Sequence, residues 1–173
     1  MSHRAALVAG SLALALASFA PVVAGQEPTA AQAWRPFEAT WSATGRRQVV
    51  AIEGGSVAAI VEISGAVVIT SGEGLSRGFR GEAIGFDDGQ GLGVGRAVWT
   101  DENGDRIFSR LKGEPLQTGK GLVGTITGGT GRYAGLEGEY SFTWQYVVPA
   151  EDGVIQGRSV GLKGRVRRSG PSQ

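Results

Sequence analysis

Cysteine is absent from the 173-residue sequence, and histidine and methionine occur once each, at His3 and Met1. Without cysteine the chain can form no disulfide bond, so its stability has to come from an ordinary hydrophobic core. If the first residues are removed, as argued below, the remaining chain also lacks histidine. That excludes a Ser-His-Asp or Cys-His nucleophile, a thiolate redox centre and a zinc site of the usual His/Cys kind.

The N-terminal segment has the pattern of a cleavable secretory signal peptide. His3 and Arg4 precede an apolar run over 5–20, and small residues follow as far as Gly25. The run is rich in alanine and shorter than the roughly 20 strongly apolar residues of a spanning helix, which favours cleavage over a retained anchor. We therefore predict a bacterial secreted or periplasmic protein with no membrane span in the mature chain.

Charge of either sign is not in excess. The chain carries 17 Lys and Arg against 16 Asp and Glu, and loss of Arg4 with the signal peptide leaves 16 of each. Proteins that bind nucleic acids or anionic membranes present a broad positive field, which this composition does not supply. We therefore expect no nucleic-acid partner.

What the sequence has in quantity is glycine, 30 residues, and short strand-like runs. These runs are rich in β-branched and aromatic residues or alternate polar with apolar residues, and glycine-containing turns separate them. The strongest single hairpin signal is Asn103-Gly104. Depending on where long runs break, they form eight or nine strands: 37–43, 48–52, 57–70, 79–86, 93–100, 106–111, 122–127, 139–148 and 154–167.

This succession predicts an all-β protein, an eight-stranded antiparallel up-and-down β-barrel. A sandwich is the alternative, but no long crossover connection of the Greek-key kind is evident. Glycine suits a barrel because it allows bulges and sharp curvature. The predicted organisation is a signal peptide over 1–25, a leader over 26–34, a barrel domain over 35–169 and a tail over 170–173.

The glycines are densest in the stretch Ile126-Thr127-Gly128-Gly129-Thr130-Gly131-Arg132-Tyr133-Ala134-Gly135, which Gly138-Glu139-Tyr140 follows. A nucleotide-binding loop is excluded because the spacing differs from the dinucleotide fingerprint, the Lys-Ser/Thr of a P-loop is missing, and a strand follows where a helix is required. We interpret the stretch as a tight connection between two strands, and we call Gly128–Gly135 the glycine corner.

The glycine corner resembles the signature of GGTG, aromatic, small residue and glycine in the barrel shared by allene oxide cyclases and plant dirigent proteins. The resemblance is specific over 121–142. It implies an eight-stranded antiparallel barrel with a lumen open at one end, commonly assembled as a homo-dimer or homo-trimer. It further implies an apolar lumen that holds a reactive small molecule, with activities that range from ring closure to the steering of coupling reactions.

The strand that leaves the glycine corner carries the candidate ligand-binding residues. Alternation places Tyr140, Phe142, Trp144 and Tyr146 on one face. If this face points inward, it lines a lumen suited to a small apolar or aromatic molecule, or it simply fills the core. If it points outward, it forms a subunit interface.

Charged residues that interrupt apolar faces are the candidate catalytic groups. They are Glu62, Glu82, Arg96 and Arg158. A buried glutamate paired with arginine could act as a general acid or base and stabilise an oxyanion in a cyclisation. The alternative is that these charges face water, because a slip of one residue exchanges the two faces of a strand.

Three functions remain open from the sequence. The leading hypothesis is a secreted binding barrel for a small apolar molecule, and the others are a cofactor-free isomerase or cyclase and a structural module with a filled core. No cofactor or metal is expected. Asp101, Asn103 and Asp105 have a faint calcium-loop spacing, but no bidentate glutamate follows and the hairpin context indicates a turn.

Overall fold

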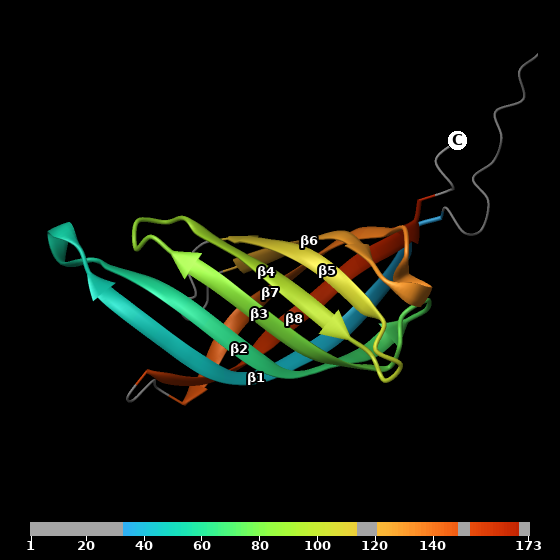
Figure 1. Ribbon diagram of the computed structural model, residues 1–173, viewed down its shortest axis with the longest axis horizontal. Coiled ribbons are helices and arrows are strands. Elements are labelled where there is room, and N and C mark those ends of the chain that lie inside the picture. Colours follow the sequence, from blue (N-terminus) through green and yellow to red (C-terminus); the bar gives the residue numbers. More distant parts are fainter. Residues whose placement is uncertain (1–32, 114–120, 149–152, 170–173) are drawn as a thin grey trace, which may run out of the picture.

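The computed structural model describes residues 33–113, 121–148 and 153–169, and in this part the chain forms a closed barrel of eight strands (Figure 1). Each strand pairs antiparallel with its neighbour in sequence, and β8 returns to pair with β1. The strands are β1 (Arg35–Ala51), β2 (Val57–Gly72), β3 (Gly78–Asp87), β4 (Gly93–Thr100), β5 (Arg106–Gly113), β6 (Gly121–Gly129), β7 (Leu136–Val148) and β8 (Val154–Arg168). The predicted eight-stranded up-and-down barrel is confirmed.

The predicted signal peptide and the tail after residue 169 lie outside the described residues, so both stay predictions. Within the described ranges, the helical elements are two short 3-10 turns, η1 (Glu53–Gly55) and η2 (Gly131–Tyr133). Accordingly, no helix of this part of the chain is long and apolar enough to cross a membrane.

The runs predicted as separate strands over 37–43 and 48–52 form one strand, β1. Gly45 lies between them and does not break the strand. It pairs with Ile63 of β2, and a Cβ at this position would overlap the neighbouring Glu62 carbonyl oxygen. The glycine therefore permits a close approach of two strands, whereas the sequence pattern suggested a break between two runs.

A β-bulge sets the register between β1 and β8. The pairing shifts between Ala39 and Ser42, and on β8 the extra residue is taken up at Gly161, whose φ is +65°. The backbone N–H of Trp41 loses its ladder partner there and donates instead to the buried hydroxyl of Ser159, at 2.8 Å. The bulge keeps large apolar side chains on the inner face on both sides of the shift.

A continuous series of aromatic rings fills the barrel interior along its length. Neighbouring centroids lie 4.9 to 6.3 Å apart with tilted, edge-on or stacked geometry, a spacing at which aromatic pairs attract beyond their area burial. The series is Tyr133, Phe79, Trp99, Tyr140, Phe142, Trp41 and Trp144, with Phe37 packed beside Trp99.

Inward-facing glycines make room for these rings. A Cβ on Gly157 would lie 2.6 Å from ring atoms of Trp144, and a Cβ on Gly124 would overlap the ring of Tyr140. A barrel of this size can hold so many large side chains because the neighbouring strand presents no side chain at the point of contact. The high glycine content is therefore tied to the aromatic interior.

The two ends of the barrel differ. One end, which we call the corner end, carries the β2–β3 and β4–β5 turns and the glycine corner, and it lies at the right in Figure 1. The opposite end carries η1 and the β3–β4 turn and lies at the left. We call it the cavity end, because the cavity described below lies in this half.

The glycine corner closes the corner end. Gly131 and Gly135 have φ values of +50° and +70°, which glycine adopts readily. The turn between them directs Tyr133 into the barrel, where its side chain is buried. The Tyr133 hydroxyl donates to Asp101 Oδ2 at 3.0 Å and accepts from the backbone N–H of Ser76 at 3.3 Å.

Arg132 completes this closure from outside. Its Nε donates to Asp101 Oδ2 at 2.8 Å and its Nη2 to Glu102 Oε1 at 2.8 Å. Burial acts to raise the pKa of Asp101, but hydrogen bonds from the turn backbone and from Tyr133, together with the charge of Arg132, outweigh it and lower the pKa from 3.8. The Asp101 carboxylate is thus stabilised in its ionised form.

This network predicts a specific acid sensitivity. A carboxylate with a lowered pKa contributes stability that is present above its unfolded-state pKa and lost as the pH falls through the folded value. We expect the melting temperature to drop below about pH 4 in the unsubstituted protein. Asp101→Asn should be less stable at pH 7 and should lose less between pH 4 and pH 2.

Thermal unfolding followed by circular dichroism from pH 7 to pH 2 measures both effects. Glu53→Gln removes one exposed carboxylate in η1 and serves as the control for loss of a charge. Parallel pH profiles for Asp101→Asn and the unsubstituted protein would contradict this role of Asp101.

Candidate functional site

The aromatic face of β7 points into the barrel. Tyr140, Phe142 and Trp144 are 2%, 5% and 1% exposed, and Tyr146 is half-buried. The intervening residues of the strand are exposed or half-exposed because alternation places them on the outer wall. The possibility that this aromatic face forms a subunit interface is therefore excluded.

In the half toward the corner end, the interior is packed. The ring of Tyr140 lies 4.9 Å from that of Trp99 and 6.2 Å from that of Phe142. Burial raises the pKa of Tyr140 to about 12, and the nearby hydroxyl of Ser109 opposes the shift. For Tyr140 the role that the structure shows is core filling.

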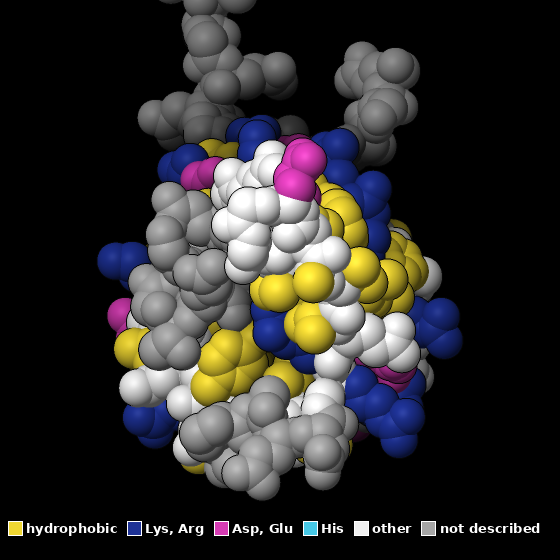
Figure 2. Space-filling view, turned by 90° about the vertical axis from the view of Figure 1, so that its left-hand side faces the viewer, with side chains coloured by type: hydrophobic (Ala, Val, Ile, Leu, Met, Phe, Trp, Pro, Cys, Tyr) yellow, Lys and Arg dark blue, Asp and Glu magenta, His cyan; other side chains and the backbone are white. Residues whose placement is uncertain are grey.

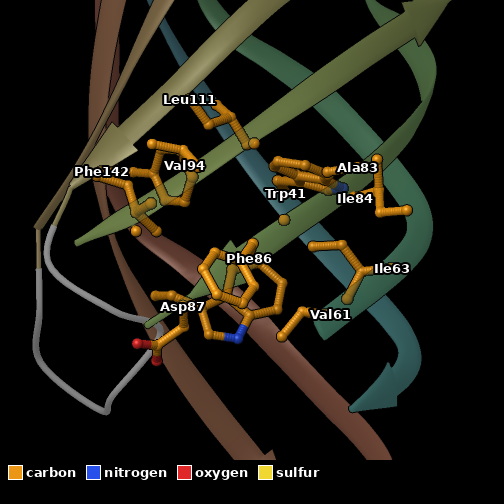
Figure 3. A pocket seen from close by; sticks show the side chains of 15 residues that line it. Trp41, Val61, Ile63, Ala83, Ile84, Phe86, Asp87, Val94, Leu111 and Phe142 are labelled. Carbon is orange, nitrogen blue, oxygen red and sulfur yellow. The ribbon is translucent and has the colours of Figure 1, made fainter. Parts of the chain in front are cut away.

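A cavity of about 40 Å³ remains in the other half, between the aromatic rings and the cavity end. It lies among inward-facing side chains of six strands, and Figure 3 shows Trp41, Ala83 and Ile63 around it. The inward-facing side chains at this cavity, apart from Asp87, are apolar or aromatic: Trp41, Val61, Ile63, Ala83, Leu111, Leu122, Phe142 and Trp144. The exposed side chains of Ile84, Phe86 and Val94 also border it. Two of the four predicted ligand-binding residues, Phe142 and Trp144, thus line one cavity.

Polar groups occur at the mouth of this cavity. Asp87 is the last inward-facing residue of β3 and is 5% exposed. Its Oδ1 accepts a hydrogen bond from the backbone N–H of Gly89 at 2.7 Å. In Figure 3 its carboxylate is turned away from the apolar side chains. Arg47 is the next inward-facing residue of β1 after Gly45. The charges of Asp87 and Arg47 both influence the pKa of Tyr146.

Tyr146 is the inward residue of β7 that follows Trp144 toward the cavity end. Burial raises the pKa of Tyr146, the charge of Arg47 opposes the shift, and the charge of Asp87 adds to it. Among the described residues, its hydroxyl has no hydrogen-bond partner. A buried hydroxyl without a partner costs about 1–3 kcal/mol, so this group is suited to receive a polar atom from a bound molecule.

Seen from outside, the cavity end is apolar as well. Figure 2 looks onto this end and shows hydrophobic side chains gathered around its middle, with Lys and Arg side chains between them. An apolar molecule that approached the mouth would therefore meet apolar side chains before it reached the cavity.

The four candidate catalytic residues do not face the interior. Glu62, Arg96 and Arg158 are exposed on the outer wall, and Glu82 is half-exposed there. Arg158 donates to Gln145 Oε1, and Glu82 lies 3.1 Å from Arg80. The expectation that they interrupt a buried face is wrong because the outer faces of β2, β3 and β4 also carry isoleucine and valine, so alternation alone did not show which face was inside.

Sequence reasoning missed three residues of the site: Trp41, Asp87 and Arg47. Trp41 alternates with Phe37, Ala39 and Ala43, a pattern that could have identified it as inward-facing. Asp87 looked like a turn residue because two further turn residues follow it. Arg47 lies where two short strands were expected, so its face could not be assigned.

The structure gives no support for a metal site. In the described ranges, no three His, Cys, Asp or Glu side chains are grouped to hold an ion. Asp101 Oδ1 instead accepts from the backbone N–H groups of Asn103 and Asp105 at 2.8 and 3.0 Å. These bonds form the β4–β5 turn, and the hairpin predicted from Asn103-Gly104 is confirmed.

A second hollow, of about 690 Å³, lies on the outer wall over β1, β7 and β8. It is open to solvent, and charged groups in it pair with each other, as Arg165 does with Glu139 at 2.7 Å. The apolar cavity is more enclosed than this hollow and is the better site for a small molecule, because ligand sites bury most of the ligand surface.

Fold and site together define a class: a small closed antiparallel β-barrel with an aromatic interior and an apolar cavity at one end. No protein-family model matches the chain, and no curated protein matches it.

Proposed function

We propose that this protein is an exported barrel that binds a small, narrow apolar molecule at the cavity end. The observation that carries the proposal is the cavity of about 40 Å³ lined by aromatic and aliphatic side chains. The eight-stranded barrel and the inward-facing aromatic strand support a relationship to the allene oxide cyclase and dirigent barrels, which we propose on that basis. Export through the N-terminal signal peptide belongs to the same proposal.

The size of the cavity limits what can enter it. Pockets for drug-sized ligands measure roughly 300–1,000 Å³, and an apolar cavity of about 150 Å³ holds benzene. A cavity of about 40 Å³ is smaller than both, although it exceeds the space that one water needs. The ligand that fits without rearrangement is therefore the end of a narrow group such as an alkyl chain.

The polar groups at the mouth indicate that the other end of the ligand is polar. Tyr146 offers a hydroxyl without a partner in the described part of the chain, and Arg47 supplies a positive charge beside it. Asp87 supplies a carboxylate at the same rim. We infer an amphiphile whose apolar end enters the cavity and whose polar end accepts a hydrogen bond from Tyr146.

Filling the cavity should abolish binding. Ala83→Leu places a larger side chain in the cavity, and we expect the affinity for octan-1-ol to fall by about tenfold or more while the fold is kept. The matched control is Ala66→Leu, the same change at an exposed position of β2. Isothermal titration calorimetry together with tryptophan fluorescence measures both variants; equal affinity for Ala83→Leu and Ala66→Leu would contradict the site.

A second candidate function is a cofactor-free isomerase or cyclase. The observation that favours it is the presence of Asp87, Arg47 and Tyr146 at one mouth, since a carboxylate, a cation and a phenol are the groups that acid–base catalysis uses. Asp87→Asn tests this second function. Both functions predict an unchanged affinity for a neutral alkyl ligand, but only an enzyme should lose turnover in the variant; turnover equal to that of the unsubstituted protein would contradict a catalytic role of Asp87.

A further inference from the structure

The outer wall of the barrel near the cavity end carries a contiguous apolar patch. Ile60, Ile84, Phe86 and Val94 are 51%, 57%, 46% and 43% exposed. Ile60 and Val94 are the cross-strand partners of Phe86 on either side, and Ile84 is the next outward residue along β3. We call these four residues the wall patch.

Charges of opposite sign flank the wall patch on opposite sides. Glu62 on β2 and Arg96 on β4 are the two cross-strand partners of Ile84. The basic side continues with Arg110, the partner of Arg96 on β5, and Glu82 lies on β3 itself, between the two sides. A surface with an apolar centre, an aromatic side chain and flanking arginine has the composition of a protein–protein interface.

This arrangement is self-complementary. A twofold axis that lies in the interface, parallel to β3 and over Ile84, places Glu62 of one copy opposite Arg96 of the other, and the reverse. Two copies related by this axis would therefore form two Glu62–Arg96 pairs and would cover both apolar centres. Such an isologous contact, with the same patch on both subunits, is the commonest way in which soluble proteins form homo-oligomers.

We propose that the wall patch binds a second copy of this chain in a twofold-symmetric dimer, with Glu62 of each subunit opposite Arg96 of the other. A lipid surface fits the patch less well, because membrane-binding surfaces present positive charge throughout and Glu62 and Glu82 interrupt it. Ile84, Phe86 and Val94 also border the cavity described above, whereas Glu62 and Arg96 do not, so exchanging these two charges tests the dimer without altering the cavity lining.

Charge exchange tests the dimer. Glu62→Arg alone and Arg96→Glu alone each place like charges opposite each other twice per dimer, and we expect the dissociation constant to rise about a hundredfold. The double variant restores opposite charges and should restore the dimer to within about tenfold of the unsubstituted affinity. Sedimentation velocity over a concentration series measures the four proteins.

The control is Val160→Glu, which adds a charge at an exposed valine of β8, away from the wall patch. It should leave the dimer unchanged. Because all substituted side chains lie on the outer wall, unaltered circular dichroism should accompany every result. A monomer at all concentrations, a trimer, or single and double variants with equal dissociation constants would overturn the proposal.

Discussion

Gly124→Ala is expected to destabilise the barrel by about 3 kcal/mol, which corresponds to a fall of about 10 °C in melting temperature. Gly124 faces inward on β6, opposite Tyr140 of β7, and a Cβ there would overlap the Tyr140 ring. The ring has little freedom to move because Tyr140 is 2% exposed and packs on Trp99 and Phe142. Overpacking of this kind forces side chains off their rotamers and shifts the backbone.

Gly121→Ala is the matched control on the same strand. A Cβ at Gly121 would meet no atom within 4 Å, and its φ lies outside the left-handed region. The added methyl group should be neutral or slightly stabilising, because it lowers the conformational entropy of the unfolded chain. Chemical denaturation of both variants gives the free energies of unfolding. Equal losses would show that Gly124 is required for a reason other than the Tyr140 ring.

Trp144→Ala is expected to lower the free energy of unfolding by about 3–5 kcal/mol. Trp144 is 1% exposed, and its ring lies 6.0 Å from that of Trp41. Its removal should enlarge the existing cavity, because Trp144 already lines it. Indole should then bind in the space and restore part of the lost stability in proportion to its concentration.

Trp34→Ala provides the comparison for loss of a tryptophan. Trp34 is 40% exposed and lies under the guanidinium groups of Arg165 and Arg167, at 4.7 and 4.4 Å from the ring centroid. Its loss should cost less than about 1 kcal/mol, and indole should not restore it. Thermal unfolding with and without indole distinguishes the variants. A loss for Trp144→Ala as small as that for Trp34→Ala would contradict the enclosed aromatic interior.

The fold could be predicted from the sequence because local signals agreed along most of the barrel, β1 being the exception. Each run of β-formers ended in turn residues, and the Asn103-Gly104 hairpin formed as its sequence indicates. The glycine corner was correctly interpreted as a connection between strands. Its closing role was not predicted, because it depends on Tyr133 meeting Asp101, 32 residues away in the chain.

The site could be predicted only in part. The aromatic face of β7 stood out because its outward residues are polar, and Phe142 and Trp144 proved to line the cavity. On β2 and β3 both faces carry aliphatic residues. The alternation of side chains along these strands therefore could not show that Glu62 and Glu82 face water. The cavity itself could not be predicted, since its volume is a small remainder among side chains from six strands.

The central claim, that the cavity end binds a narrow apolar molecule, is tested most directly by the indole N–H signals of the four tryptophans in a ¹H–¹⁵N spectrum. Trp41 and Trp144 line the cavity, Trp99 lies in the packed half, and Trp34 lies outside the barrel. On titration with octan-1-ol, the signals of Trp41 and Trp144 should shift together and saturate, while those of Trp99 and Trp34 stay in place. Shifts at Trp34 alone, or no saturable shift at Trp41 and Trp144, would contradict the account.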